Sequence, residues 1–220
     1  MRVLITGGRG LIGTVLRDRL PFSVTPFDLP ESDATDLTQL TAALEGHDAL
    51  IHLGWNTQVE HYKSEQIYPP NLLMAYNAYN AAIRCGVRRV LVASSVHADE
   101  YVSHTPGNGP IDPYRLPTPD SPYGASKCMV EALGRMYANR GLLDVVCIRF
   151  GGVNRDDNPE LSRTWLSHRD CASLIFASLN ANIPDGFAIV YGASKQVSPV
   201  HSSENPMGWT PLDTGVAFKS

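Results

Sequence analysis

A glycine-rich turn near the start of the chain sets the strongest limit on its fold. Residues 3–6 form an apolar run that suits a buried strand, and residues 11–20 carry the pattern of a helix. Gly7, Gly10 and Gly13 follow the strand at three-residue spacing. Glycines placed in this way allow a tight turn, a close approach of the backbone to a pyrophosphate, and close packing of the helix on the strand. The pattern therefore predicts a nucleotide-binding strand–turn–helix unit.

Short apolar runs alternate with helical stretches along the rest of the chain. The expected strands cover residues 3–6, 24–27, 49–53, 90–93, 145–148 and 188–191. The expected helices cover residues 11–20, 37–44, 66–85, 121–139 and 170–179. This alternation predicts an α/β fold in which right-handed βαβ units build one parallel sheet with helices on both faces. We expect a Rossmann-like, doubly wound sheet.

The length of the chain, 220 residues, suits a single domain with a sizeable core. We expect a cofactor-binding core in residues 1–150 and small substrate-binding segments in residues 151–220. The substrate-binding lobe should be minimal, because the tail 196–220 is short and irregular. The loop 98–120 is polar, rich in proline and long for a compact domain, and loops of that length are usually functional.

Asp28 ends the expected second strand, about twenty residues after the glycine turn. A carboxylate there accepts hydrogen bonds from the ribose hydroxyls of the cofactor and repels a 2′-phosphate, which favours NAD over NADP. The plainer interpretation is an aspartate that caps a turn. Arg9, inside the glycine turn, is the residue that would tolerate NADP. Further cofactor contacts are expected from Leu11, Ile12, Asp36, Leu37, Leu53 and Gly54.

Tyr123 and Lys127 lie four residues apart in the expected helix 121–139, and this spacing puts both on one face of the helix. Tyrosine is a poor base at its ordinary pKa of about 10, and a nearby ammonium lowers that value. We therefore expect Lys127 to make Tyr123 an acid/base group near neutral pH, and to hold the nicotinamide ribose. Ser95 follows the fourth strand and would orient the substrate oxygen. Ser94 is its competitor for that role.

These features, together with residues 52–54 and Asn71, resemble the extended short-chain dehydrogenase/reductases, the NAD-dependent epimerase/dehydratase family. Within that family the chain looks most like the uronate dehydrogenases. The supporting segments are residues 93–97, 123–128, 148–151, 164–167, 190–194 and 208–209. Those enzymes oxidise the C1 hydroxyl of a hexuronic acid to a lactone and reduce NAD. The resemblance implies that Asn71 belongs to the cofactor site.

The resemblance also implies roles for residues around the substrate. Tyr123 would take the proton of the C1 hydroxyl, and Ser95 would hold its oxygen. His97 and Thr57 would contact the sugar, although His97 can also be read as a loop residue bonded to the backbone. The expected function is therefore NAD-dependent oxidation of a sugar or sugar-acid hydroxyl.

Three positions depart from the uronate dehydrogenase pattern. Val96 stands where an asparagine follows the catalytic serine, and Gly152 stands where the family has a serine. Glu160 stands where the family has the arginine that grips the uronate carboxylate. Arg163 or Arg155, which lie close by in sequence, could take over that carboxylate. Against a negatively charged substrate Glu160 would be repulsive.

Two other functions fit parts of the pattern. The first is a nucleotide-sugar epimerase or dehydratase, in which NAD is recycled inside the site. Such an enzyme needs a substantial lobe for the nucleotide, and the short tail after Tyr191 argues against it. The second is a non-catalytic NAD(P)-sensing module. Proteins of that kind typically lose the pair that this chain keeps at Tyr123 and Lys127.

Composition limits the partners of the protein. A formal net charge of −4 and the lack of a basic block argue against nucleic acid. No apolar stretch is long enough to span a bilayer, and the glycine turn leaves no room for a signal peptide, so we expect a cytoplasmic protein. Cysteine and histidine spacings suggest no metal. We expect small, buried thiols at all four cysteines, which are Cys85, Cys128, Cys147 and Cys171.

A homo-oligomer is expected from the resemblance, since such proteins commonly pair through the helix that carries the tyrosine and the long helix before it. Met74, Ala75, Ala78 and Ala82 could line such a contact, and a face buried inside the chain is equally consistent with them. Tryptophans are expected to serve packing, with Trp55 as the exception because it follows the cofactor-facing residues 53–54.

Overall fold

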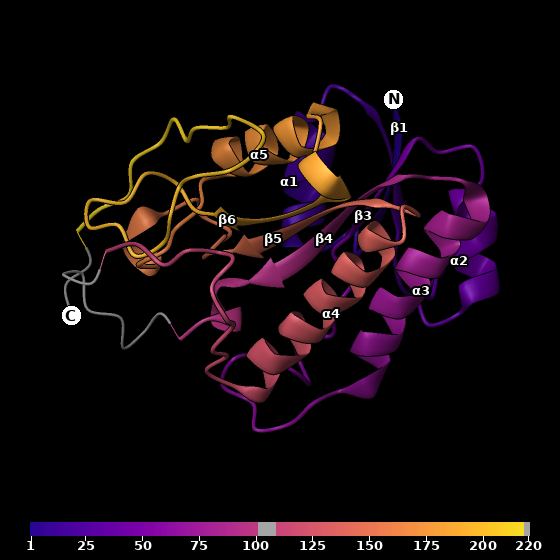
Figure 1. Cartoon of the computed structure of the whole chain (residues 1–220), viewed down its shortest axis with the longest axis horizontal. Helices are drawn as coiled ribbons and strands as arrows, with labels where there is room; N and C mark the ends of the chain where they lie inside the picture. The colour runs from indigo at the N-terminus through magenta and orange to yellow at the C-terminus, as the bar shows by residue number, and fades with distance from the viewer. Residues whose placement is uncertain (101–108, 218–220) are drawn as a thin grey trace.

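The computed structural model describes residues 1–100 and 109–217 (Figure 1). Its centre is one sheet of six strands in the order β2-β1-β3-β4-β5-β6, with all neighbours parallel. The strands are β1 (Arg2–Thr6), β2 (Ser23–Phe27), β3 (Ala49–His52), β4 (Arg89–Ser95), β5 (Asp144–Phe150) and β6 (Phe187–Gly192). The α-helices are α1 (Leu11–Arg19), α2 (Leu37–Leu44), α3 (Pro69–Cys85), α4 (Pro122–Asn139) and α5 (His168–Asn180). The predicted α/β fold with a doubly wound parallel sheet is confirmed.

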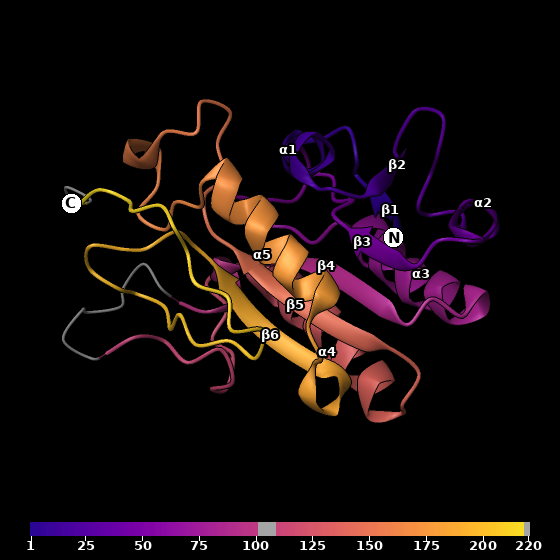
Figure 2. The ribbon, with the colours of Figure 1, turned by 90° about the horizontal axis from the view of Figure 1, so that it is seen from above.

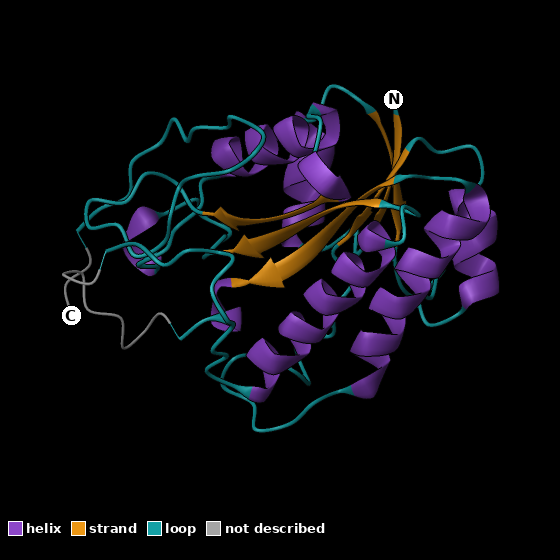
Figure 3. Ribbon diagram, viewed as in Figure 1, coloured by secondary structure: helices purple, strands orange, loops and turns teal. Residues whose placement is uncertain are grey.

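Helices cover both faces of the sheet, whose strands are orange in Figure 3. On one face α1 and α5 contribute Leu16 and Ile175 to a buried cluster. On the other face α2, α3 and α4 contribute Leu40, Ala78 and Val130 to a second cluster. Because both faces of the central strands are buried, those strands read as unbroken apolar runs in the sequence.

Two helices begin more than one residue away from their predicted starts. The third helix begins at Pro69, not at residue 66. Proline suits the first turn, where no amide donor is needed, and it disfavours helical geometry in the residue before it. The fifth helix begins at His168, two residues before the predicted start, because the Ser167 hydroxyl caps it by accepting from the backbone amide of Asp170.

The β5–α5–β6 connection has the opposite hand to β3–α3–β4 and β4–α4–β5. All three connections step in the same direction across the sheet, but α3 and α4 lie on one face and α5 lies on the other, with α1 (Figure 2). The expectation that all βαβ units share one hand is therefore wrong for the last one. Residues 151–167 explain the difference, since this long segment carries the chain past the carboxyl edge of the sheet before α5 begins.

The described part of the tail, residues 193–217, forms no helix or extended strand and is tied to α5. Asp170 is fully buried in that helix. Its carboxylate accepts hydrogen bonds from the backbone amides of Leu212 at 2.8 Å and Asp213 at 3.0 Å, and from the hydroxyl of Ser194 at 2.7 Å. The irregular tail therefore has a fixed position without regular secondary structure.

The face of α3 that was considered for a subunit contact is used inside the chain. Ala75, Ala78 and Ala82 are fully buried in the core, and Met74 packs partly against it. The four cysteines carry free thiols, two of them buried and two partly buried. Across the described ranges, no helix combines the length and the apolar character needed to cross a membrane.

Candidate active site

The glycine turn lies where the sheet changes its winding direction, between β1 and β3. The helices that follow these strands lie on opposite faces, and doubly wound sheets bind ligands in the crevice that such a change opens. Gly7 has a left-handed φ of 68°, and a Cβ there would lie 2.9 Å from the backbone nitrogen of Gly54. A Cβ at Gly13 would lie 2.6 Å from the carbonyl carbon of Gly8. Neither position accepts a side chain.

The N-terminus of α1 opens onto this crevice. Gly10 is its N-cap, no side chain caps it, and a Cβ at Gly10 would approach only the carbonyl oxygen of Gly7, at 3.2 Å. The first backbone amides of the helix, those of Leu11 and Ile12, therefore remain available to an anion. Leu53 directly follows β3 beside the turn. This cradle of backbone donors without side chains fits the diphosphate of a dinucleotide.

Asp28 directly follows β2, half-buried. Its carboxylate accepts from the backbone amides of Arg9 at 3.0 Å and Leu29 at 2.9 Å, so it joins the end of β2 to the glycine turn. The carboxylate oxygens keep further lone pairs for a ribose hydroxyl. The guanidinium of Arg9 is paired with the carboxylate of Glu31, in the loop after β2.

Three residues that were expected to touch the cofactor have structural partners. Asp36 caps α2 by accepting from two backbone amides at 2.9 and 3.0 Å, and Leu37 packs against the core. Asn71 is fully buried. Its Oδ1 accepts from the backbone amide of Asn56 at 2.7 Å, and its Nδ2 donates to Glu60 at 2.9 Å. In this structure Asn71 therefore ties the loop before α3 to the helix, and its contact with the cofactor stays a prediction.

Ser95, Tyr123 and Lys127 come together at the carboxyl end of β4. The Ser121 hydroxyl caps α4 by accepting from a backbone amide at 3.1 Å, and Tyr123 lies in the first turn. The hydroxyl of Ser95, the last residue of β4, interacts with the side chain of Tyr123. One turn further along α4, the buried Nζ of Lys127 donates to the carbonyl of Ala93 at 2.9 Å.

Ser94 belongs to a separate buried network. Its hydroxyl donates to Glu131 at 2.5 Å. Arg149 donates to both carboxylate oxygens of Glu131 at 2.8 Å and also contacts the carboxylate of Asp99. Arg149 and Asp99 are fully buried, and each charge in the network faces an opposite one. Of the two candidate serines, the structure thus puts Ser95 beside Tyr123.

Burial dominates the electrostatics of the Tyr123–Lys127 pair. It raises the pKa of Tyr123, and the interaction with the Ser95 hydroxyl opposes that rise only in part. Burial also lowers the pKa of Lys127 to about 7, against the opposing effect of the carboxylates of Glu60 and Glu131. The lowering of the tyrosine pKa that was expected from Lys127 therefore does not outweigh the effect of burial in this structure.

Trp55 and His52 surround Lys127. Its Nζ lies 3.4 Å from the centre of the Trp55 ring, and that ring meets the Tyr123 ring edge-on at 6.0 Å. His52, the last residue of β3, is buried and shares a 2.7 Å hydrogen bond with the hydroxyl of Thr6. Burial and then the charge of Lys127 lower the pKa of His52 to about 3, so this imidazole is neutral. The sequence singled out Trp55 but gave His52 no role.

His97 packs beside Tyr123, with a ring-centre distance of 6.1 Å. Its Nδ1 pairs with the carboxylate of Asp120 at 2.7 Å, and its ring stacks on Tyr62 at 4.5 Å. Neither Asp120 nor Tyr62 was predicted as a site residue, since only the fold brings their loops to the histidine. Thr57 lies exposed in the loop after β3.

Gly152 shows how one departure from the family pattern is accommodated. A Cβ at this position would lie 2.2 Å from Oγ of Ser162. The hydroxyl of Ser162 therefore occupies the space next to Gly152, where the family pattern has a serine side chain. A serine hydroxyl thus lies beside Gly152, supplied from a position ten residues further along the chain.

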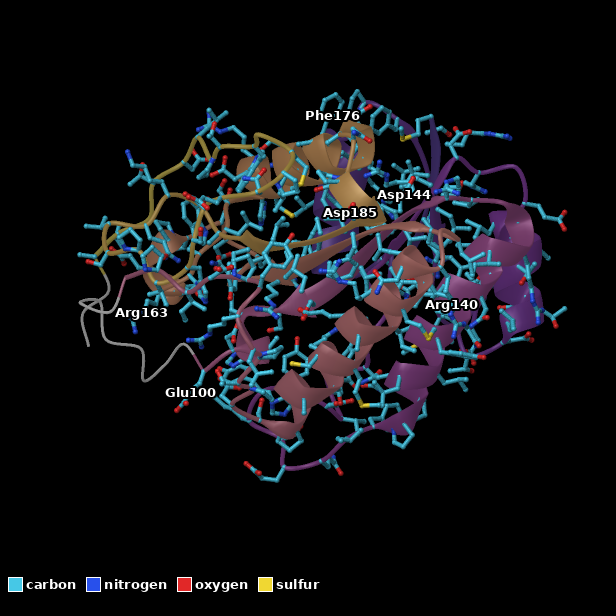
Figure 4. All side chains as sticks on the ribbon, in the orientation of Figure 1. Glu100, Arg140, Asp144, Arg163, Phe176 and Asp185 are labelled. Atoms are coloured by element: carbon cyan, nitrogen blue, oxygen red, sulfur yellow. The ribbon has the colours of Figure 1, made fainter. Side chains whose placement is uncertain are left out.

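The charged residues of the segment 151–167 lie beyond the carboxyl ends of the strands. Arg163 is half-buried and lies on the same side of the molecule as Glu100, away from Asp144 and Asp185 at the opposite edge of the sheet (Figure 4). Glu160 and Arg155 are exposed. Within the ranges that the structure describes, no three His, Cys, Asp or Glu side chains gather as metal ligands.

A doubly wound parallel sheet with a glycine cradle at its change of winding defines a dinucleotide-binding α/β protein. The chain belongs to the NAD dependent epimerase/dehydratase family, whose family model matches residues 3–154.

Curated and solved relatives agree with this assignment. The chain is 33% identical to a uronate dehydrogenase of Agrobacterium fabrum, over 99% of this chain and 87% of that one. It is 30% identical to an L-arabinose 1-dehydrogenase (NAD(P)(+)) of Haloferax volcanii, over 84% of each chain. The crystal structure of a uronate dehydrogenase variant from Agrobacterium tumefaciens in complex with NAD superposes with a TM-score of 0.80 at 30% identity, over 97% of this chain and 85% of that one.

Proposed function

We propose that this protein is an NAD-dependent dehydrogenase that oxidises a hydroxyl of a sugar or sugar acid, with oxidation at C1 to a lactone as the reaction. The observation that carries the proposal is the meeting of Ser95, Tyr123 and Lys127 at the sheet edge beside the glycine turn. Relatives named as uronate and L-arabinose dehydrogenases support the same class of substrate.

In the proposed reaction Tyr123 is the base. Its phenolate oxygen takes the proton of the substrate hydroxyl, while Ser95 donates a hydrogen bond to the same substrate oxygen and holds it beside the tyrosine. The ammonium of Lys127 stabilises the phenolate. When bound, NAD supplies the acceptor for the hydride that leaves the carbinol carbon. Loss of this proton and this hydride turns the hydroxyl into a carbonyl.

We assign the cofactor to residues 1–150, with the glycine turn on the diphosphate and Asp28 on the adenosine ribose. A carboxylate at that place supports NAD as the preferred cofactor, because it repels a 2′-phosphate. The ion pair between Arg9 and Glu31 supports the same preference, because Glu31 engages the guanidinium that would otherwise bind a 2′-phosphate. Lys127 would hold the hydroxyls of the nicotinamide ribose.

For the substrate we propose contacts from Thr57, His97 and Arg163, the last within residues 151–220. Arg163 is half-buried, and it forms no ion pair with any residue in the described part of the chain. A guanidinium in this state suits a substrate carboxylate. The exposed Glu160 acts against such a substrate by repulsion.

A panel of substrates tests the proposal. Purified protein is incubated with NAD and with glucuronate, galacturonate, neutral aldoses or aldose phosphates, and the absorbance of free NADH is followed. NADH formed with uronates alone supports the role of Arg163 in binding the substrate carboxylate. A preference for neutral or phosphorylated sugars would mean that the substrate pocket around Glu160 differs from that of the uronate dehydrogenases. Product formation without release of NADH would overturn the proposal in favour of an epimerase or dehydratase that recycles its cofactor.

The proposal extends to assembly as a homodimer. The helices α3 and α4 pack side by side and expose apolar residues, namely Leu73, Tyr76 and Met129. Large exposed apolar side chains on neighbouring helices suit a contact with a second copy. Sedimentation equilibrium of the wild type and of a Tyr76→Glu variant tests this contact, and a monomeric wild type would contradict it.

A further inference from the structure

Glu60 is a fully buried carboxylate in the loop between β3 and α3. One of its oxygens, Oε2, accepts from the backbone amide of Tyr68 at 3.0 Å and from Nδ2 of Asn71 at 2.9 Å. The other oxygen, Oε1, is buried and has no hydrogen-bond partner among the residues that the structure describes. A buried carboxylate with one idle oxygen is costly unless an opposite charge compensates it.

The groups in contact with Lys127 do not neutralise its positive charge. Its Nζ contacts two neutral groups, the carbonyl of Ala93 at 2.9 Å and the ring of Trp55 at 3.4 Å. His52, on β3, is neutral and brings no negative charge. Glu131 lies one turn along the same helix, but its two carboxylate oxygens are already engaged by the guanidinium of Arg149.

Three residues with buried, unpartnered polar atoms interact with Lys127. The unpartnered atoms are Nε2 of His52, Nε1 of Trp55 and Oε1 of Glu60. Lys127 contacts the ring of Trp55 and interacts electrostatically with His52 and Glu60. Among them only Glu60 carries a negative charge. Its loop is tied to that of Trp55, because the backbone amide of Glu60 donates to the carbonyl of Asn56 at 3.0 Å.

We propose that Glu60 is the counter-ion of Lys127: its carboxylate holds the buried ammonium in the charged form and thereby acts as a positioning residue for the reaction. The inference rests on the proposed function only for the role that it gives to Lys127. After burial, which lowers the pKa of Lys127 to about 7, the carboxylate of Glu60 is the largest influence and acts in the opposite direction. It also raises the pKa of Tyr123, so Glu60 couples to both members of the pair.

The scarcity of lysine makes a direct test possible. The chain has only four lysines, Lys63, Lys127, Lys195 and Lys219, so a protein with isotope-labelled lysine side chains gives few resonances. The signal of Lys127 is the one that disappears in Lys127→Arg. Its titration midpoint is followed by nuclear magnetic resonance in the wild type, in Glu60→Gln and in Glu60→Asp. The matched control is Glu65→Gln, which removes an exposed carboxylate from the same loop.

We expect the titration midpoint of Lys127 to be highest in the wild type, lower in Glu60→Asp and lowest in Glu60→Gln. Aspartate keeps the charge at a greater distance, and glutamine removes it. The glutamine keeps an oxygen for Tyr68 and Asn71, and Glu65→Gln leaves the midpoint unchanged. An unchanged midpoint in Glu60→Gln overturns the proposal. If that variant does not fold, Glu60→Asp decides in the same way, since a lowered midpoint supports the counter-ion role and an unchanged one overturns it.

Activity gives a second, separate measurement. Loss of the Glu60 charge lowers both pKa values of the pair, so the pH profile of NADH formation moves as a whole toward acid in Glu60→Gln. A role in folding alone would reduce the height of the profile without moving it. If the wild type forms no NADH with any sugar, the proposed function fails, while the lysine titration still tests Glu60.

Discussion

The hydroxyl of Ser95 interacts with the side chain of Tyr123, while the hydroxyl of Ser94, one residue earlier on β4, donates to Glu131 at 2.5 Å. Successive residues of a strand point to opposite sides, so one serine faces the cleft and the other faces the buried network. Adjacent and chemically identical side chains thus have different surroundings, and this difference can be measured.

Replacing these serines one at a time separates their roles. Ser95→Ala should lower the rate of NADH formation by about 10²-fold, because it removes a donor to the substrate oxygen. Ser94→Ala should keep most of the activity, since Arg149 still holds Glu131 through two hydrogen bonds. Initial rates at saturating NAD provide the comparison. Equal losses in the two variants would contradict the assignment of Ser95.

Tyr123→Phe removes the proposed base and little else. We expect turnover to fall by about 10²–10⁴-fold, the usual contribution of a positioned acid/base group. Binding of NAD, measured by calorimetric titration, should be nearly unchanged. The exposed Tyr76, on α3, provides the control Tyr76→Phe, which should behave as the wild type. Undiminished turnover in Tyr123→Phe would contradict the role of Tyr123 as the base.

Cofactor preference should depend on Asp28. In Asp28→Asn the repulsion of a 2′-phosphate by the carboxylate is lost, a like-charge term of about 1–4 kcal/mol at contact distance. We therefore expect the ratio of kcat/KM for NADP to that for NAD to rise by about tenfold. Asp18→Asn, on the exposed side of α1, should leave this ratio unchanged. A ratio that does not move in Asp28→Asn would show that the carboxylate does not face the ribose.

His52 should make the fold sensitive to acid. Its pKa is lowered from 6.5 to about 3 in the folded chain, first by burial and then by Lys127, so the unfolded state binds a proton that the folded state does not. The free energy of unfolding should therefore decrease as the pH falls from 6.5 to about 3, by about 1.4 kcal/mol per pH unit from this group. Above pH 6.5 the group adds no pH dependence.

Urea unfolding at a series of pH values measures this effect. The His52→Gln variant lacks the titrating imidazole and should show a shallower loss of stability below pH 6.5 than the wild type. The difference between the two proteins, not the absolute curve, isolates His52 from the carboxylates. Parallel curves would rule out a buried neutral imidazole at this position.

The sheet and its helices could be read from the sequence because their signals are local. The apolar run of residues 145–148 marks β5, and the Ser121 cap with Pro122 marks the start of α4. The hand of β5–α5–β6 could not be read in this way. It depends on where residues 151–167 lead the chain, and that path is set by contacts far apart in sequence.

The candidate site was predictable where a motif fixes geometry. The four-residue spacing of Tyr123 and Lys127 and the glycine spacing required no tertiary information. Glu60 and Asp120 were missed because each is an isolated charge in a loop, and only folding brings it to its partner. The family resemblance assigned Asn71 to the cofactor site. Its burial and its hydrogen bonds to Glu60 and Asn56 depend on how the loop before α3 packs, which the sequence does not show.

Residues 151–167 link β5 to α5 without belonging to either, and they carry Arg163, Glu160 and the Gly152–Ser162 pair. A change in the length of this link alters the wall beyond the sheet edge while strand register and the glycine turn stay as they are. Under the proposed function, substrate range and cofactor use are separable traits, and an exchange of this link should alter one while retaining the other.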